Sequence, residues 1–140
     1  MTDTQNILQH WLQPQWPAVD GVHALFTTRY GGCSAAPFDT MNLGDHVRDD
    51  PLHVARNRAR LQAVISEMTG QQAQPVFMQQ VHGCEVQSLQ ATAVHGQAFD
   101  AAVTTTADVV CTVMVADCLP VLFAHRSGKA VAAAHAGWRG

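Results

Sequence analysis

Residues 131–140, VAAAHAGWRG, contain the strongest structural signal in the chain. From Ala130 to His135 the residues are small or apolar on both alternating faces, which is typical of a strand inside a sheet covered on both sides. A Gly-Trp-Arg-Gly cluster follows. We therefore predict an interior strand that carries a histidine at its end. Because too few residues follow to cover such a strand, we also expect the domain to be incomplete at the C-terminus.

Apolar runs upstream predict further strands, at 22–29, 75–82, 84–89, 109–116 and 120–125. A long helix is expected from Pro51 to about Met68, with Asp49 or Asp50 as its N-cap and Gly70 as its C-terminal cap. A short helix is expected at 4–12. This pattern predicts a single α/β domain over residues 1–140, with mixed α+β layers and mixed β-sheets flanked by helices.

The composition limits the classes of partner. The 140 residues are 47% hydrophobic and carry a net charge of -3, with Lys129 as the single lysine. This argues against a disordered chain and against nucleic acid as a partner. No signal peptide and no apolar run long enough to cross a membrane is seen, so we expect no membrane partner and a cytoplasmic location. The four cysteines form no C-x-x-C pair, and we expect free thiols.

Three side chains that can bind a metal each lie where a predicted strand ends. His82 ends FMQQVH, Cys118 follows VMVAD, and His135 ends VAAAH. Two histidines and one cysteine form a plausible zinc set, since catalytic zinc keeps three protein ligands and one open position. Two alternatives remain open on the residues alone. The three side chains could be ordinary core and strand-end residues. Cys118 could also be a nucleophile with His82 or His135 as its base, and Asp117 as an orienting or proton-relaying carboxylate.

A second group of polar residues is a candidate for substrate binding. Arg29 adjoins two glycines in FTTRYGG, a combination suited to holding a phosphate or carboxylate. Asn42 and His46 lie in NLGDHV, although turn chemistry explains Asn42 equally well. Arg139 is a further candidate anion ligand. A surface arginine before a turn is the simpler interpretation of Arg29.

Six blocks of sequence, in order, resemble the YfiH-type family, also called laccase-domain, polyphenol oxidase or purine nucleoside phosphorylase proteins. The blocks are FTTRYGG, NLGDHVRDDP, QQVHG, FDAAVT, VADCLP and HAGWRG. The resemblance covers nearly the whole chain, and it implies that the chain is an N-terminal fragment with HAGWRG as an interior segment. One departure is Arg48, where relatives commonly have glycine.

The resemblance implies a mixed α/β fold similar to cysteine hydrolases, with zinc held by His82, Cys118 and His135. It implies a phosphorylase that acts on adenosine, inosine, guanosine or methylthioadenosine with phosphate, and that also deaminates adenosine. A copper polyphenol oxidase is the main alternative, with Met114 or Met78 as an axial ligand. A hydrolase or binding protein for peptidoglycan precursors is a further alternative. The oligomeric state is not predicted.

Overall fold

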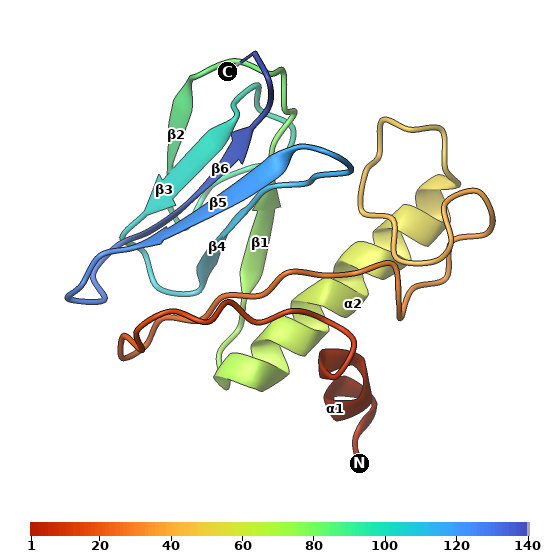
Figure 1. Cartoon of the computed structure of the whole chain (residues 1–140), viewed down its shortest axis with the longest axis horizontal. Coiled ribbons are helices and arrows are strands. Elements are labelled where there is room, and N and C mark those ends of the chain that lie inside the picture. The colour runs from red at the N-terminus through yellow and green to blue at the C-terminus, as the bar shows by residue number, and fades with distance from the viewer. Residues whose placement is uncertain (140) are drawn as a thin grey trace. The chain divides into compact units, whose positions relative to one another are not determined.

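The computed structural model describes residues 1–139, which divide into two compact units. One unit, here the helical unit, comprises Met1–Trp16 and His23–Gln71. The other, the sheet unit, comprises Pro17–Val22 and the chain from Gln72 onward. Figure 1 labels the elements of both. The prediction of a single domain stays a prediction. No helix in the described chain combines the length and apolarity needed to cross a bilayer.

The helical unit is built on α2, Pro51–Thr69, as the sequence predicts. The Asp50 side chain accepts a hydrogen bond from the Leu52 N–H at 2.8 Å, and Pro51 occupies the first turn. Gly70 ends the helix in the left-handed conformation at φ 69°. These local signals set both ends of the helix before any packing is considered.

The N-terminal segment differs from the sequence prediction. Helix α1 spans Asp3–Leu8 and stops short of residue 12. Gln9 caps the helix, and the backbone of Leu12 exchanges two hydrogen bonds with Phe26, each of 2.8 Å. The predicted strand at 22–29 is wrong: within this range the structure has only that isolated bridge. Without a neighbouring strand, the apolar run does not extend into a ladder.

Asn57 of α2 organises the irregular chain between residues 33 and 42. Its side chain is 1% exposed. Its amide oxygen accepts from the Cys33 N–H at 2.9 Å. Its amide nitrogen donates to Ser34 Oγ and to the carbonyls of Thr40 and Asn42, at 2.9, 3.2 and 2.8 Å. A part-buried loop needs such partners because its backbone groups make no regular ladder.

The sheet unit contains two sheets. Strands β1 (Gln74–Phe77) and β4 (Val109–Thr112) form a parallel pair. The second sheet has the order β2-β3-β6-β5, made of Val86–Leu89, Ala101–Thr104, Val131–Ala136 and Leu119–Ala124. The β2–β3 pair is parallel and the other two pairs are antiparallel. The predicted mixed α/β class is confirmed.

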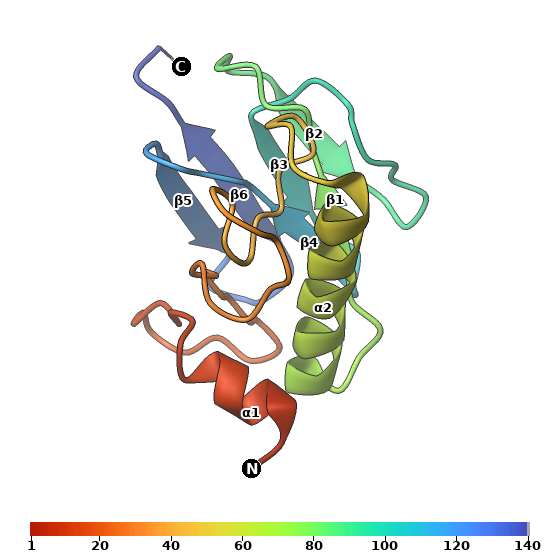
Figure 2. The same ribbon diagram turned by 90° about the vertical axis from the view of Figure 1, so that its right-hand side faces the viewer.

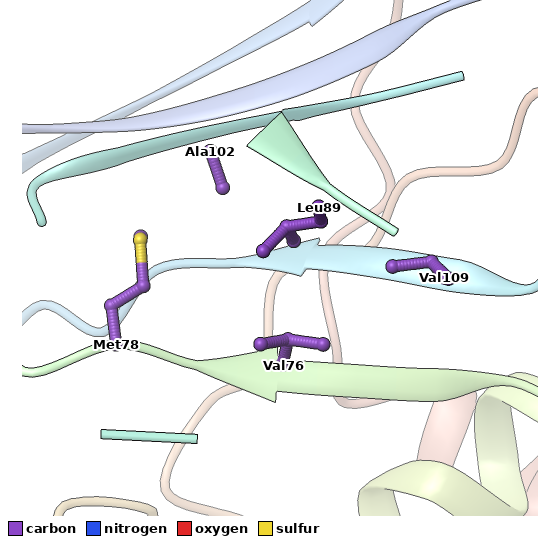
Figure 3. Close-up of a cluster of buried hydrophobic side chains, with 5 residues drawn as sticks. All are labelled: Val76, Met78, Leu89, Ala102 and Val109. Atoms are coloured by element: carbon purple, nitrogen blue, oxygen red, sulfur yellow. The ribbon is translucent and has the colours of Figure 1, made fainter. Parts of the chain in front are cut away.

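The two sheets pack through one apolar cluster. Val76, Met78, Leu89, Ala102 and Val109 are all at most 6% exposed, and Figure 3 shows their side chains meeting between the strands. Burial of these side chains is the main force that joins the sheets.

Two differences from the predicted strands matter for the site. β3 is not among the predicted strands, because its AAVT sequence carries little apolar bulk. β1 ends at Phe77, so His82 lies in the loop beyond the strand and does not end it.

Replacing Asn57 by alanine should destabilise the protein. The change removes the partner of one part-buried N–H and of two part-buried carbonyls, and a polar group left unsatisfied costs about 1–3 kcal/mol when it is buried. We expect a loss of about 1–3 kcal/mol in the free energy of unfolding, measured by urea denaturation. Asn6→Ala, which removes an exposed amide from α1, is the matched control. Equal effects of the two changes would contradict the role of Asn57.

Asp49 should make stability depend on acid pH. Its carboxylate accepts hydrogen bonds from Ser34 and Asn42, at 2.6 and 3.0 Å, and these lower its pKa below the usual 3.8. A lowered pKa contributes stability above the unfolded value, and that contribution is lost as pH falls through the folded value. The wild type should therefore exceed Asp49→Asn in stability near neutral pH, and the difference should shrink below pH 3.8. A difference that stays constant with pH would refute this.

Candidate metal centre

His82, Cys118 and His135 come together in the sheet unit. One ligand atom from each lies within 4.8 Å of the others. Cys118 Sγ lies 3.8 Å from His82 Nε2, and the two imidazole rings meet edge to face with centroids 4.8 Å apart. His135 is buried, Cys118 is half-buried and His82 is exposed. The cluster is therefore open to solvent on the His82 side.

The antiparallel pairing of β5 and β6 brings two of these residues together. His135 is the penultimate residue of β6, and Leu119, at the start of β5, pairs with Ala136. Cys118 directly precedes β5 and so lies beside the end of β6. β5 and β6 lie side by side in both Figure 1 and Figure 2. The prediction that the candidate ligands lie where strands end holds for His135. It is wrong for Cys118, because β4 stops at Thr112 and Cys118 precedes the start of β5.

His82 reaches the cluster from a tight loop anchored on Asp100. The backbone N–H groups of Val81, His82 and Gly83 all donate to the Asp100 carboxylate, at 3.2, 2.9 and 2.8 Å. His82 itself has a positive φ of 57°, which is uncommon for a residue with a side chain. The loop therefore relies on the carboxylate to hold this conformation.

Asp100 also contacts His135, and sequence reasoning missed it. His135 Nδ1 lies 2.9 Å from Asp100 Oδ1, and the His135 N–H donates to the Asp100 carbonyl at 2.7 Å. Burial raises the pKa of Asp100, but the hydrogen bonds from His135 and the three N–H groups outweigh it and lower the pKa. The available signal was an aspartate directly before the short apolar run AAVT.

Gln80 is a second residue that sequence reasoning missed. Its side-chain amide pairs with the backbone of Met114 as a strand partner would. Gln80 Nε2 donates to the Met114 carbonyl at 2.7 Å, and the Met114 N–H donates to Gln80 Oε1 at 2.6 Å. This pair ties the loop that carries His82 to the segment that leads to Cys118.

The surroundings of Cys118 do not favour a nucleophilic thiolate. Partial burial and the neighbouring Asp117 raise the pKa of the Cys118 thiol, whose Sγ lies 3.7 Å from Asp117 Oδ1. Nucleophilic cysteines need the opposite shift, caused by a nearby positive charge. A bound cation would supply that charge and hold the cysteine as a thiolate. The metal-ligand interpretation therefore fits these surroundings better than the cysteine-hydrolase alternative.

The donor set fits a metal ion such as zinc. Bonds of about 2.0–2.3 Å in a tetrahedron place ligand atoms about 3.3–3.8 Å apart. The Cys118–His82 separation of 3.8 Å matches this, and the remaining atoms lie within 4.8 Å. Three protein donors leave a fourth position for a water or a substrate atom.

The other predicted site residues have different surroundings. Arg29, Asn42 and His46 belong to the helical unit, so their substrate role stays a prediction. The Asn42 side chain bonds Gly44 and Asp49, as the turn interpretation expected. The Gly32 N–H near Arg29 donates to Thr40 Oγ1 at 3.2 Å. His46 Nδ1 lies 3.9 Å from Asp45 Oδ1. The Arg139 guanidinium lies 4.3 Å from the centroid of the exposed Trp138 ring.

Comparison with known proteins identifies the family. Residues 23–140 match the family described as multi-copper polyphenol oxidoreductase laccase, and the chain belongs to this family. The purine nucleoside phosphorylase YfiH of Escherichia coli strain K12 is 49% identical over 127 residues, which are 91% of this chain and 51% of that protein. A Pseudomonas aeruginosa purine nucleoside phosphorylase is 49% identical over 130 residues, 93% of this chain and 50% of that protein.

A solved structure agrees with this family. The crystal structure of a Neisseria meningitidis protein matches with a TM-score of 0.80 and 45% identity, over 94% of this chain and 52% of that one. The chain thus spans about half the length of the relatives it matches. The resemblance drawn from the motifs is confirmed.

Gly137→Ala should disturb the cluster. A Cβ at Gly137 would lie 2.6 Å from His82 Cδ2, so the imidazole must move away. We expect zinc affinity to fall by about tenfold or more, as measured by competition with a chelator. Gly83→Ala is the matched control, because its Cβ would make an ordinary 3.5 Å contact with Asp100. Unchanged affinity in the Gly137 variant would argue against His82 as a ligand.

Proposed function

We propose that the chain forms the metal centre of a zinc-dependent purine nucleoside phosphorylase. The observation that carries this proposal is the convergence of His82, Cys118 and His135, with one exposed side. The names of the similar E. coli and P. aeruginosa proteins supply the substrate class. Zinc bound there would act as a Lewis acid toward a substrate atom in the fourth position. The free thiols support the proposal that the protein works in the reducing cytoplasm.

The reaction needs a phosphate group and a leaving purine to be held in line. A phosphate oxygen bonds to C1′ of the sugar while the C1′–N bond to the purine breaks, and the bonding electrons leave with the base. We assign phosphate binding to Arg29, whose side chain is exposed and permanently charged. Asn42, His46 and Arg139 are assigned to substrate contacts.

Adenosine deamination is a second proposed activity of the same cluster. It replaces the amino group at C6 by the oxygen of water and therefore needs a group that moves a proton. Asp117 supports this role, because it is exposed and its Oδ1 lies 3.7 Å from Cys118 Sγ. The zinc deaminase signatures H-x-E and P-C-x-x-C are absent from the sequence, so a deaminase here would use a different arrangement.

The copper oxidase alternative has weaker support from the side chains. The family description favours copper, and two histidines with a cysteine are also a copper donor set. Of the two axial candidates, Met78 is 3% exposed and packs within the core cluster in Figure 3. Met114 stays an axial candidate, because its hydrogen bonds to Gln80 involve only its backbone. A blue absorption band of the metal-loaded protein would favour copper over zinc.

Cys118→Ala tests the proposed function. The full protein and the variant are each incubated with adenosine, with and without phosphate, and the products are separated by chromatography. We expect phosphate-dependent release of adenine, lost in the variant together with bound zinc, because the variant has only two ligands left. Cys84→Ala removes an exposed thiol outside the cluster and is the matched control.

Each other result points to a named alternative. Inosine formed without phosphate would assign the cluster to deamination. Full phosphorolysis with normal zinc in the Cys118 variant would remove Cys118 from the site. No turnover of adenosine by the wild type would refute the nucleoside proposal and favour a peptidoglycan-precursor hydrolase or binding protein.

A further inference from the structure

We propose that Asp100 is the positioning residue of the metal centre: it fixes the tautomer of His135 so that Nε2 is the ligand atom, and it holds the His82 loop in place. This inference rests on the proposed metal centre. It adds a residue that contacts two ligand-bearing segments without being a ligand itself.

The hydrogen-bond chemistry of Asp100 determines which nitrogen of His135 faces the metal. Asp100 Oδ1 lies 2.9 Å from His135 Nδ1, and both side chains are buried. A carboxylate only accepts, so the imidazole must carry its proton on Nδ1. The lone pair of Nε2 is then available for a metal. A carboxylate paired with a ligating histidine in this way also makes the histidine a stronger donor.

The acceptor capacity of Asp100 is used up within the protein. Oδ1 receives the N–H of His82 and Nδ1 of His135, and Oδ2 receives the N–H groups of Val81 and Gly83. Two carboxylate oxygens offer about four lone-pair sites, so all are occupied. Asp100 is 3% exposed, and neither of its carboxylate oxygens is open to a metal ion. Asp100 therefore acts through its neighbours.

One carboxylate thus couples two ligands from separate segments. His82 depends on it because the backbone there has a positive φ of 57°, held by three converging N–H groups. His135 depends on it through both the side-chain contact and the 2.7 Å hydrogen bond from its own N–H to the Asp100 carbonyl. Loss of the charge should affect both ligands together.

Asparagine at position 100 cannot reproduce this arrangement. If its oxygen faces His135, its NH₂ group points at the donors of Val81 and Gly83. If the amide is reversed, its NH₂ group faces Nδ1 and forces the His135 proton onto Nε2, which removes the ligand lone pair. The reversed amide also points its NH₂ group at the His82 N–H, so either orientation places two donors against each other.

The test uses the full protein, wild type and Asp100→Asn, with ¹⁵N-labelled histidines. NMR of the metal-free protein reports which His135 nitrogen carries the proton, and chelator competition reports zinc affinity. We expect the proton on Nδ1 in the wild type. In Asp100→Asn we expect zinc affinity to fall by about 10–100-fold and the His135 signals to change. Asp108→Asn, at an exposed position outside the cluster, is the matched control and should leave both readouts unchanged.

Two results would overturn the proposal. One is a wild-type His135 with its proton on Nε2, a measurement that stands even if the variant fails to fold. The other is a folded Asp100→Asn variant with wild-type tautomer and zinc affinity. A wild type with Nδ1 protonated but without zinc affinity would refute the proposed metal centre while supporting the role of Asp100 in setting the tautomer.

Discussion

The geometry of the candidate metal centre depends on four hydrogen bonds that converge on the carboxylate of Asp100. A buried charge is costly unless every acceptor site is filled, so the chain around it has little freedom to rearrange. The carboxylate lies directly before β3 and reaches both the loop beyond β1 and the end of β6. Three segments far apart in the sequence are thereby brought to one point. The uncharged side chain of Gln80 adds two hydrogen bonds to the backbone of Met114, in the segment before Cys118.

The helical unit uses the same principle with an uncharged group. Asn57 lies on the buried face of α2 and supplies hydrogen-bond partners to a loop that forms no sheet ladder. The amide suits this place because it both donates and accepts, whereas a carboxylate only accepts. In each unit, a buried polar side chain orders an irregular segment: Asn57 on α2 in one, and Asp100 directly before β3 in the other. Candidate functional residues lie on or next to these irregular segments.

The three candidate ligands differ in their exposure to solvent, and this difference bears on the chemistry of the cluster. His135 is buried and fixed by Asp100, Cys118 is half-buried, and His82 faces solvent. A structural metal site closes all four positions with protein ligands, whereas a catalytic site keeps one position open. Three donors with one exposed side are what the proposed function requires. Partial burial and Asp117 raise the pKa of the Cys118 thiol, so a bound cation would be needed to hold it as a thiolate.

The sequence by itself determined the features that depend on neighbouring residues. Asp50, Pro51 and Gly70 mark the ends of α2, apolar runs indicate most of the strands, and His82, Cys118 and His135 are identifiable as candidate ligands. Only the tertiary structure brought in Asp100, Gln80 and Asn57, because the groups they bind come from distant parts of the chain. The same reason explains β3, which is a strand because it has neighbours on both sides, and residues 22–29, whose apolar pattern has no neighbour to form a ladder. The backbone conformation of Arg48 is likewise seen only in the structure. Its φ of 69° explains why glycine suits that position, and no local sequence pattern reveals this conformation.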